Sequence, residues 1–404
     1  MPNPAPTLFF LHIPKTAGTT LAALLEQHYP EPDVIPRRFF DKNALYVTPD
    51  DVERRLDEAR SFALIRGHYG GPIRERFFTD RTSITVLREP RARVVSLYND
   101  WRTKSDENLA DAPPAERELA ALARDLDLGR FLSSGHPLVD RLFRDAQARQ
   151  LCGFLWDSAR PSEGDAKRAL DAFDLVGTAE LLDPFAIALC RRLGWAPPPA
   201  APRLNTSRGE ARLSRLDART LSVIDTLTPL DRAAHAHAQA LCARTLAELL
   251  AEPPAAAPFE PTDHADLDML APIDGSGWHV REGLDSPHPW RWTGPEREST
   301  LLLPLAPGRD YRVRVWVISV IAPDILEGAH LTAGGRSLDI ERRDAERGHT
   351  ILSARLPASL VSRGAPTRLG ILVPRTISHA DVQPETQDPR PKGLAVTRVT
   401  ADPA

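Results

Sequence analysis

The sequence predicts a two-part chain, an α/β domain with a parallel sheet flanked by helices and then an all-β sandwich or jelly roll. In the first 250 residues, short apolar runs alternate with segments of helical period. A proline- and alanine-rich stretch, 251–261, follows them. Beyond it the pattern becomes alternating, as in YRVRVWV at 311–317, and no helical period appears. Strands interleaved with helices favour a parallel sheet, and repeated short strands favour a sandwich.

The change in composition sets the expected domain boundaries. We expect an α/β domain over residues 1–250, a stiff linker over 251–267 and a β domain over 268–404. Proline in a linker restricts the backbone, so this segment predicts a semi-rigid spacer.

The first strand is predicted over Leu8–Leu11, an apolar run of four residues. A polar turn follows and ends in Thr19-Thr20, before leucines at helical spacing. A strand, a turn and a helix N-terminus can form an anion cradle, because the first turn of a helix has unpaired N–H groups and the positive end of the dipole. In this turn Gly18 allows close approach of the backbone, and Lys15 adds a compact charge. An ordinary strand-turn-helix with a solvated lysine is the alternative.

Two further strands are expected to end beside the first. The run 62–65 leads into Arg66-Gly67-His68, and the run 83–87 leads into Arg88-Glu89-Pro90 and a helix over 91–102. Ligands of parallel α/β sheets bind at the carboxyl edge, where these polar residues are expected.

The remaining elements of the α/β domain are mostly helical. We expect helices, strands and loops in this order: a helix over 50–60, a loop over 105–116, helix over 116–149 with a break near 133–137, a strand over 174–177, a helix over 181–193 closed by Gly194, a helix beginning near Arg208, and a helix over 231–250.

Charge and cysteine content exclude several classes of protein. A net charge of −4 argues against bulk nucleic-acid or polybasic membrane binding, so an anion site must be local. The three cysteines, 152, 190 and 242, give neither a disulfide framework nor a zinc pattern. With no leader or membrane-spanning run apparent, we expect a cytoplasmic protein in a reducing compartment. The oligomeric state stays open.

The three strand ends suggest a specific chemistry. Arg88 and Ser96 can hold a second phosphate through charge-assisted hydrogen bonds, and two anion sites on one edge suit a nucleotide phosphorylated at two places. Between them, His68 is placed to take a proton from an alcohol near neutral pH. A turn-capping histidine, a strand-end arginine and a helix-interior serine are the structural alternatives.

These segments resemble a known family. HIPKTAGTT at 12–20 resembles the 5′-phosphosulfate loop of sulfotransferases that use 3′-phosphoadenosine 5′-phosphosulfate (PAPS), and LREPRARVVSLY at 87–98 resembles their 3′-phosphate segment. The branch most similar is the heparan sulfate 2-O-sulfotransferase-like group, in which a glycine-histidine pair, here Gly67-His68, carries the base. The resemblance covers roughly residues 7–250.

The resemblance implies a P-loop-like fold and a set of residue roles. His68 would deprotonate a carbohydrate or glycoconjugate hydroxyl, Lys15 would stabilise the leaving phosphate, and no metal would be needed. His12 and Arg66 are the candidate acceptor-binding residues. The residues implied to bind PAPS are Lys15, Thr16, Ala17, Gly18, Thr19, Thr20, Arg88 and Ser96. His12 stands where sugar-specific relatives often have arginine, which puts a uronic acid acceptor in doubt.

Two other functions stay open. A P-loop kinase or NTPase is disfavoured because Lys15 precedes Gly18, so the order G-x-x-x-x-G-K-[ST] is absent. The other is a non-catalytic nucleotide- and glycan-binding protein. The second domain resembles β-sandwich modules of some bacterial sugar transferases, on the segments Gly277-Trp278, Trp290–Gly294 and Asp388–Leu394. Their tryptophans either stack on sugars or anchor the core, and the core is favoured.

Overall fold

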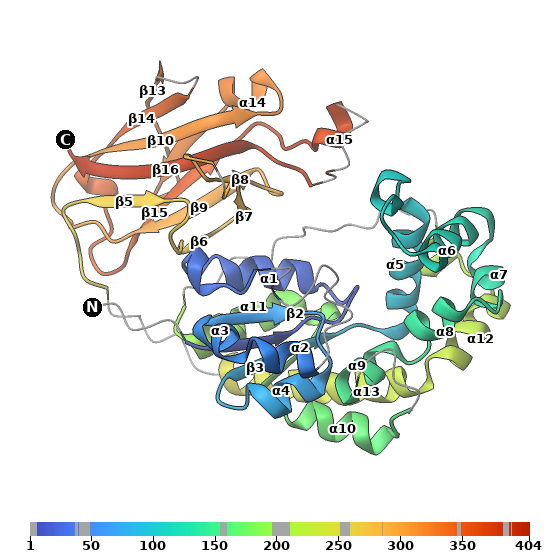
Figure 1. Cartoon of the computed structure of the whole chain (residues 1–404). Helices are drawn as coiled ribbons and strands as arrows, with labels where there is room; N and C mark the ends of the chain where they lie inside the picture. The colour runs from blue at the N-terminus through green and yellow to red at the C-terminus, as the bar shows by residue number, and fades with distance from the viewer. Residues whose placement is uncertain are drawn as a thin grey trace. The chain divides into compact units, whose positions relative to one another are not determined.

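The chain divides into two compact units. The structure is a computed structural model, and it describes residues 6–36, 39, 49–153, 160–195, 211–250, 259–284, 286–345, 349–382, 388 and 390–404. The segments of unit 1 are Met1–Gly18, Asp33–Phe185 and Thr206–Ala251, and those of unit 2 are Thr19–Pro32, Ala186–Asn205 and Glu252–Ala404. The N-terminal region is α/β and the C-terminal region is β structure (Figure 1).

A parallel sheet lies in unit 1. In the described residues it has four strands in the order β2-β1-β3-β4. The strands are β1 (Leu8–Leu11), β2 (Leu64–Gly67), β3 (Thr82–Leu87) and β4 (Leu175–Thr178). Leu11 pairs with Gly67 on one side and with Thr85 on the other, so the carboxyl ends of the three strands meet at one edge. Helices flank the sheet (Figure 1), and the predicted α/β architecture is confirmed.

Thirteen α-helices are described before the C-terminal β region. Their bounds are α1 (Gly18–Glu26), α2 (Pro49–Arg54), α3 (Leu56–Ser61), α4 (Gly71–Phe77), α5 (Pro90–Thr103), α6 (Pro114–Asp125), α7 (Leu128–Leu132), α8 (Pro137–Phe143), α9 (Ala146–Cys152), α10 (Glu163–Asp171), α11 (Leu182–Leu193), α12 (Ala218–Leu227) and α13 (Pro229–Leu250). None of the helices in the described ranges is long and apolar enough to cross a bilayer.

The helices differ from the prediction in where they break. The helix expected over 50–60 is interrupted at Arg55, which has a non-helical φ of −124°. The start expected near Arg208 lies outside the described residues. As expected, Gly194 follows α11 in the left-handed conformation, with a φ of 72°.

The segment 116–149 is also more broken than expected, because three polar residues start new helices inside it. Asp127 accepts the Arg130 N–H and caps α7, and His136 accepts the Leu138 N–H and caps α8. Asp145 precedes α9 with a left-handed φ of 43°. The segment therefore forms several short helices, and residues of these helices pack with α5 in one apolar core.

Two apolar cores are described in unit 1. One packs the sheet against its helices and includes Phe9, Ile65 and Ile73. The other packs around α5 and includes Tyr98 and Phe131. Helix α5 therefore contributes one face to a core, which fixes the orientation of its other residues.

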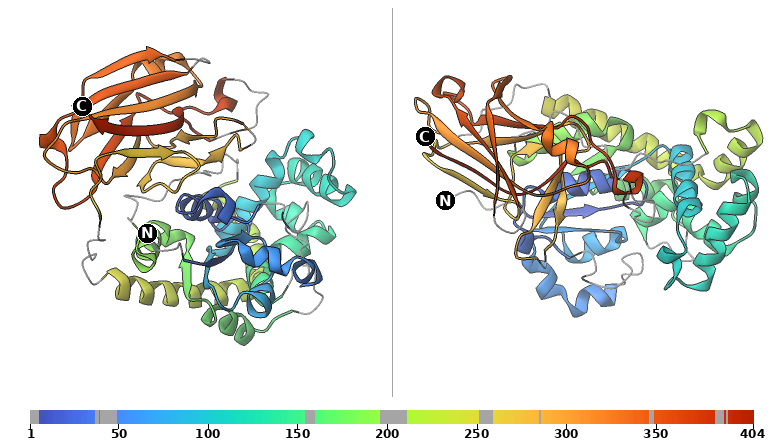
Figure 2. Two further views of the ribbon diagram at one scale, coloured as in Figure 1. Left: turned by 60° about the vertical axis from the view of Figure 1, so that its left-hand side comes forward. Right: turned by 90° about the horizontal axis from the view of Figure 1, so that it is seen from above.

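The C-terminal part of unit 2 contains two antiparallel sheets. One has the path β13-β14-β10-β16-β8-β7, with β5 beside β16, and the other has the order β12-β11-β15-β9-β6. The strand bounds are β5 (Ala265–Asp268), β6 (Gly275–Ser276), β7 (Trp278–Glu282), β8 (Trp290–Thr293), β9 (Glu298–Leu303), β10 (Tyr311–Val320), β11 (His330–Ala333), β12 (Arg336–Leu338), β13 (Ile340–Asp344), β14 (Thr350–Leu356), β15 (Thr367–Leu372) and β16 (Leu394–Pro403). Both views of Figure 2 show this region as mainly strands.

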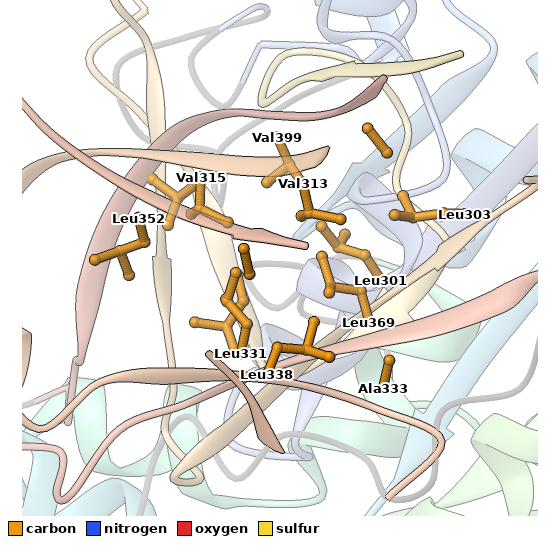
Figure 3. Close-up of a cluster of buried hydrophobic side chains, with 14 of the residues drawn as sticks. Leu301, Leu303, Val313, Val315, Leu331, Ala333, Leu338, Leu352, Leu369 and Val399 are labelled. Carbon is orange, nitrogen blue, oxygen red and sulfur yellow. The ribbon is translucent and has the colours of Figure 1, made fainter. Parts of the chain in front are cut away.

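One apolar core joins these two sheets. Val313 and Val315 of the first sheet and Leu301 and Leu369 of the second belong to the same buried cluster (Figure 3). On β10, Val313, Val315 and Val317 are buried and the residues between them are only partly buried, as the alternating sequence predicts. The arrangement is sandwich-like. Two short helices, α14 (Pro323–Glu327) and α15 (His379–Val382), occur where no helix was expected.

We predict that Gly71→Ala destabilises the protein by about 1–3 kcal/mol, because overpacking against backbone cannot relax easily. A Cβ at Gly71, the first residue of α4, would lie 1.8 Å from the carbonyl oxygen of Leu151 on α9. Gly164→Ala on α10 is the matched control, since its Cβ would meet the flexible end of Arg168 at 3.3 Å and Oγ of Ser162 at an ordinary 3.7 Å. Thermal unfolding should show a lower Tm for Gly71→Ala alone, and equal Tm values would contradict this packing.

Candidate functional site

The carboxyl edge of the parallel sheet brings together the residues predicted there. His12 follows β1, His68 follows β2 and Arg88 follows β3. The rings of His12 and His68 are in contact, with centroids 4.3 Å apart. Residues separated by more than fifty positions therefore lie side by side because the strands are in parallel register.

The contacts of His68 fix its tautomer. Its Nδ1 lies 2.7 Å from the backbone carbonyl oxygen of His12. A carbonyl can only accept, so Nδ1 carries the hydrogen and Nε2 keeps its lone pair. Burial lowers the pKa of His68, and the charge of Arg66 lowers it further, while the hydrogen bond to His12 opposes both. The imidazole is therefore neutral at pH 7, with Nε2 able to accept a proton.

A buried glutamine that was not predicted supports this arrangement. Gln150 on α9 donates from Nε2 to the carbonyl oxygen of His12 at 3.3 Å and to that of Tyr69 at 2.9 Å. It is 2% exposed. Gln150 therefore ties the segment after β1 to the segment after β2.

A second glutamine on the same helix face fixes the end of β3. The Gln147 side chain accepts the Arg88 N–H at 2.9 Å and donates to the Arg88 carbonyl oxygen at 2.9 Å. The Gln147 amide thus makes the pair of hydrogen bonds with the Arg88 backbone that a neighbouring strand would otherwise make. Two glutamines three residues apart, on one face of the segment AQARQLC, were the available sequence signal.

The loop between β1 and α1 has its carbonyl groups fixed by neighbouring donors. The carbonyl oxygens of three successive residues, 13 to 15, accept from the Thr16 hydroxyl at 2.8 Å, Arg93 Nε at 3.1 Å and Arg88 Nη1 at 3.3 Å. Lys15 and Ala17 are both left-handed, with φ of 68° and 65°. Left-handed residues in a turn are typical of backbone nests, in which successive N–H groups can bind an anion.

Position 18 requires glycine for a different reason from the one expected. Gly18 begins α1 without a positive φ. A Cβ on it would lie 1.9 Å from Cδ2 of His12. The glycine is needed because the His12 ring packs against the loop backbone. Of the two threonines that follow, Thr19 is exposed and Thr20 is buried.

Lys15 has a carboxylate partner that the sequence did not indicate. Its Nζ lies 2.6 Å from Oδ1 of Asp100 on α5. Ser96, also on α5 and 6% exposed, is one helical turn from Asp100 and on the same helix face. The ammonium has three hydrogens, so one bond to Asp100 leaves others for a bound anion.

A buried acid lies behind the loop. Arg93 is 2% exposed and donates to the Pro14 carbonyl oxygen. Asp231 on α13 accepts the Ala148 N–H at 2.8 Å. Burial raises the pKa of Asp231 to about 6, and the charge of Arg93 opposes that rise. Arg93 thus bonds to the loop and lies near enough to Asp231 for its charge to act on that carboxyl group.

The tryptophan and lysine motifs of the β region occupy its interior. Trp278 is 2% exposed and Trp292 is 4% exposed. Trp292 donates to Glu282, and Lys392 lies 2.7 Å from Asp388 in the same charged network. Trp278 and Trp292 therefore have the core role that the sequence favours.

No protein-family model matches the chain, and no curated protein matches it. Within the described ranges, no three His, Cys, Asp or Glu side chains are grouped to hold a metal ion. The case for a function therefore rests on the edge of the parallel sheet.

We predict that Asp231→Asn removes a pH-dependent part of the stability. The folded pKa of about 6 lies above the ordinary 3.8, so this group favours the folded state most below about pH 4 and loses that contribution as pH rises through 6. The expected change in unfolding free energy is roughly 3 kcal/mol over that range.

Denaturant unfolding from pH 4 to 7 measures this change. The exposed Asp125→Asn is the control, and it should keep the wild-type slope. A wild-type slope in Asp231→Asn would mean that Asp231 titrates normally.

Proposed function

We propose that the chain transfers the sulfuryl group of PAPS to a hydroxyl of a carbohydrate or glycoconjugate. The observation that carries the proposal is the His68 imidazole, which is held by the His12 carbonyl with Nε2 as its basic nitrogen. It lies at the same sheet edge as the loop with the left-handed residues Lys15 and Ala17. In this proposal the loop is a P-loop-like cradle for the phosphosulfate, and the C-terminal sheets form an accessory β-sandwich.

The proposed step uses the residues as follows. His68 Nε2 takes the hydroxyl proton, the oxygen forms a bond to sulfur, and the bond from sulfur to the phosphate oxygen breaks with its electrons on the phosphate. The N–H groups of residues 16–20 and the Lys15 ammonium balance the charge that develops there. The ion pair with Asp100 holds the Lys15 ammonium in place before the donor binds.

The second phosphate of the donor is assigned to the end of β3. Arg88 is half-buried, its backbone is fixed by Gln147, and its guanidinium already reaches the loop at Lys15. Burial lowers the pKa of Arg88, and the nearby Glu180 and Glu89 oppose that change. A cation held in this way can bind a 3′-phosphate, with the Ser96 hydroxyl as a second donor.

The acceptor is assigned to the histidine side of the edge. His12 is in ring contact with His68, and Arg66 is near enough to lower the pKa of His68. Both could contact the ring that carries the reacting hydroxyl, while His68 acts on the hydroxyl itself.

We predict that His68→Ala lowers the rate of sulfuryl transfer at least about a hundredfold and changes PAPS affinity less than threefold, because a general base acts in the reaction and not in donor binding. Labelled transfer and calorimetric titration measure the two quantities. His237→Ala is the control, since His237 lies on α13 and is 2.7 Å from Asp171. Full transfer activity in His68→Ala would contradict the assignment of His68 as the general base.

We predict that Arg88→Ala weakens binding of adenosine 3′,5′-bisphosphate about 10- to 100-fold and that of AMP less than threefold, because only the bisphosphate has a 3′-phosphate to lose its partner. Arg168→Ala on α10, whose guanidinium pairs with Asp165, is the matched control. Equal losses for both ligands would assign Arg88 to the loop alone and not to a 3′-phosphate.

A further inference from the structure

A pocket on the C-terminal β region is separate from the site described above. Its volume is about 580 Å3, within the range usual for small-ligand sites. The side chains that matter are Trp316, Arg398, Asp266, Asp268, His288 and His349. All of them belong to unit 2.

The sheet register builds one wall of this pocket. Trp316 on β10 pairs with Arg398 on β16, and Arg398 pairs with Asp268 on β5. Directly opposed residues of antiparallel strands project from the same face. Val315 and Val317, the neighbours of Trp316, are in the core, so the row of an indole, a guanidinium and a carboxylate lies on the outer face.

The charged groups of the wall are held in place. Arg398 donates from Nε to Oδ1 of Asp266 at 2.7 Å and from Nη2 to the other oxygen. Asp268 accepts the Leu270 N–H on Oδ1 at 2.7 Å. Among the described residues, no hydrogen-bond donor contacts Oδ2 of Asp268. The pocket therefore presents a fixed acceptor beside a fixed guanidinium.

Two histidines contribute an additional polar and aromatic surface. His288 and His349 contact each other edge to face, with ring centroids 5.1 Å apart. Both line the same pocket as the indole.

We infer that this pocket binds a neutral sugar ring. One face of a pyranose is apolar and can lie on the Trp316 indole, while adjacent hydroxyls can donate to Asp268 and accept from Arg398. The two carboxylates outnumber the single guanidinium, which disfavours a sulfated or uronic acid sugar. The Arg398 guanidinium is 5.7 Å from the indole centroid, which disfavours a cationic ligand.

The test is binding of a saccharide panel to the full chain. The probes are methyl glycosides and tetrasaccharides of glucose, galactose, mannose and N-acetylglucosamine, with glucose 6-sulfate and tetramethylammonium as charged probes. Tryptophan fluorescence and saturation-transfer NMR measure the binding. At least one neutral saccharide should bind saturably and at least about tenfold more tightly than either charged probe.

Variants then locate the site. Trp316→Ala should weaken that saccharide at least about tenfold, Trp316→Phe should keep part of the binding, and Asp268→Asn should weaken it. Ile318→Ala, two residues along β10 and outside the pocket, should bind as wild type does. Thermal melts confirm that each variant is folded. The inference is overturned if no neutral saccharide binds, if a charged probe binds more tightly, or if folded Trp316→Ala binds as wild type does.

Discussion

The backbone carbonyl of His12 is the acceptor on which the edge of the parallel sheet depends. It receives a hydrogen bond from His68 and another from Gln150, so it joins the end of β1 to the end of β2 and to α9. Without that acceptor, the His68 imidazole would have no fixed tautomer. The parallel register makes the contact, because Leu11 and Gly67, which precede the two histidines, are paired.

The same edge stores backbone strain in the loop. Lys15 and Ala17 are non-glycine residues in the left-handed region, which costs about 1–2 kcal/mol each. The donors Arg88 and Arg93, which bond to loop carbonyl groups, offset that cost. Left-handed residues are typical of nests that bind anions, so in the proposed function this loop would need little rearrangement to hold a phosphate.

Much of this architecture could be predicted from local sequence. Apolar runs that end in polar residues predicted the strands and their shared edge. The alternation of apolar and polar residues predicted β10 and the burial of its alternate valines. The partners of the site residues could not be predicted, because they come from distant segments. Gln147, Gln150 and Asp100 lie on helices whose packing depends on tertiary contacts. The steric requirement for glycine at position 18 could not be predicted either, because it depends on where the His12 ring packs.

The measurement that tests the proposal most directly is transfer of labelled sulfate from PAPS to glycans by the unmodified chain, with labelled ATP and magnesium as the parallel donor. The account predicts that sulfate label enters a carbohydrate fraction and that one adenosine 3′,5′-bisphosphate is released for each sulfate transferred. Transfer or hydrolysis from ATP, with PAPS left intact across the acceptors, would contradict the account.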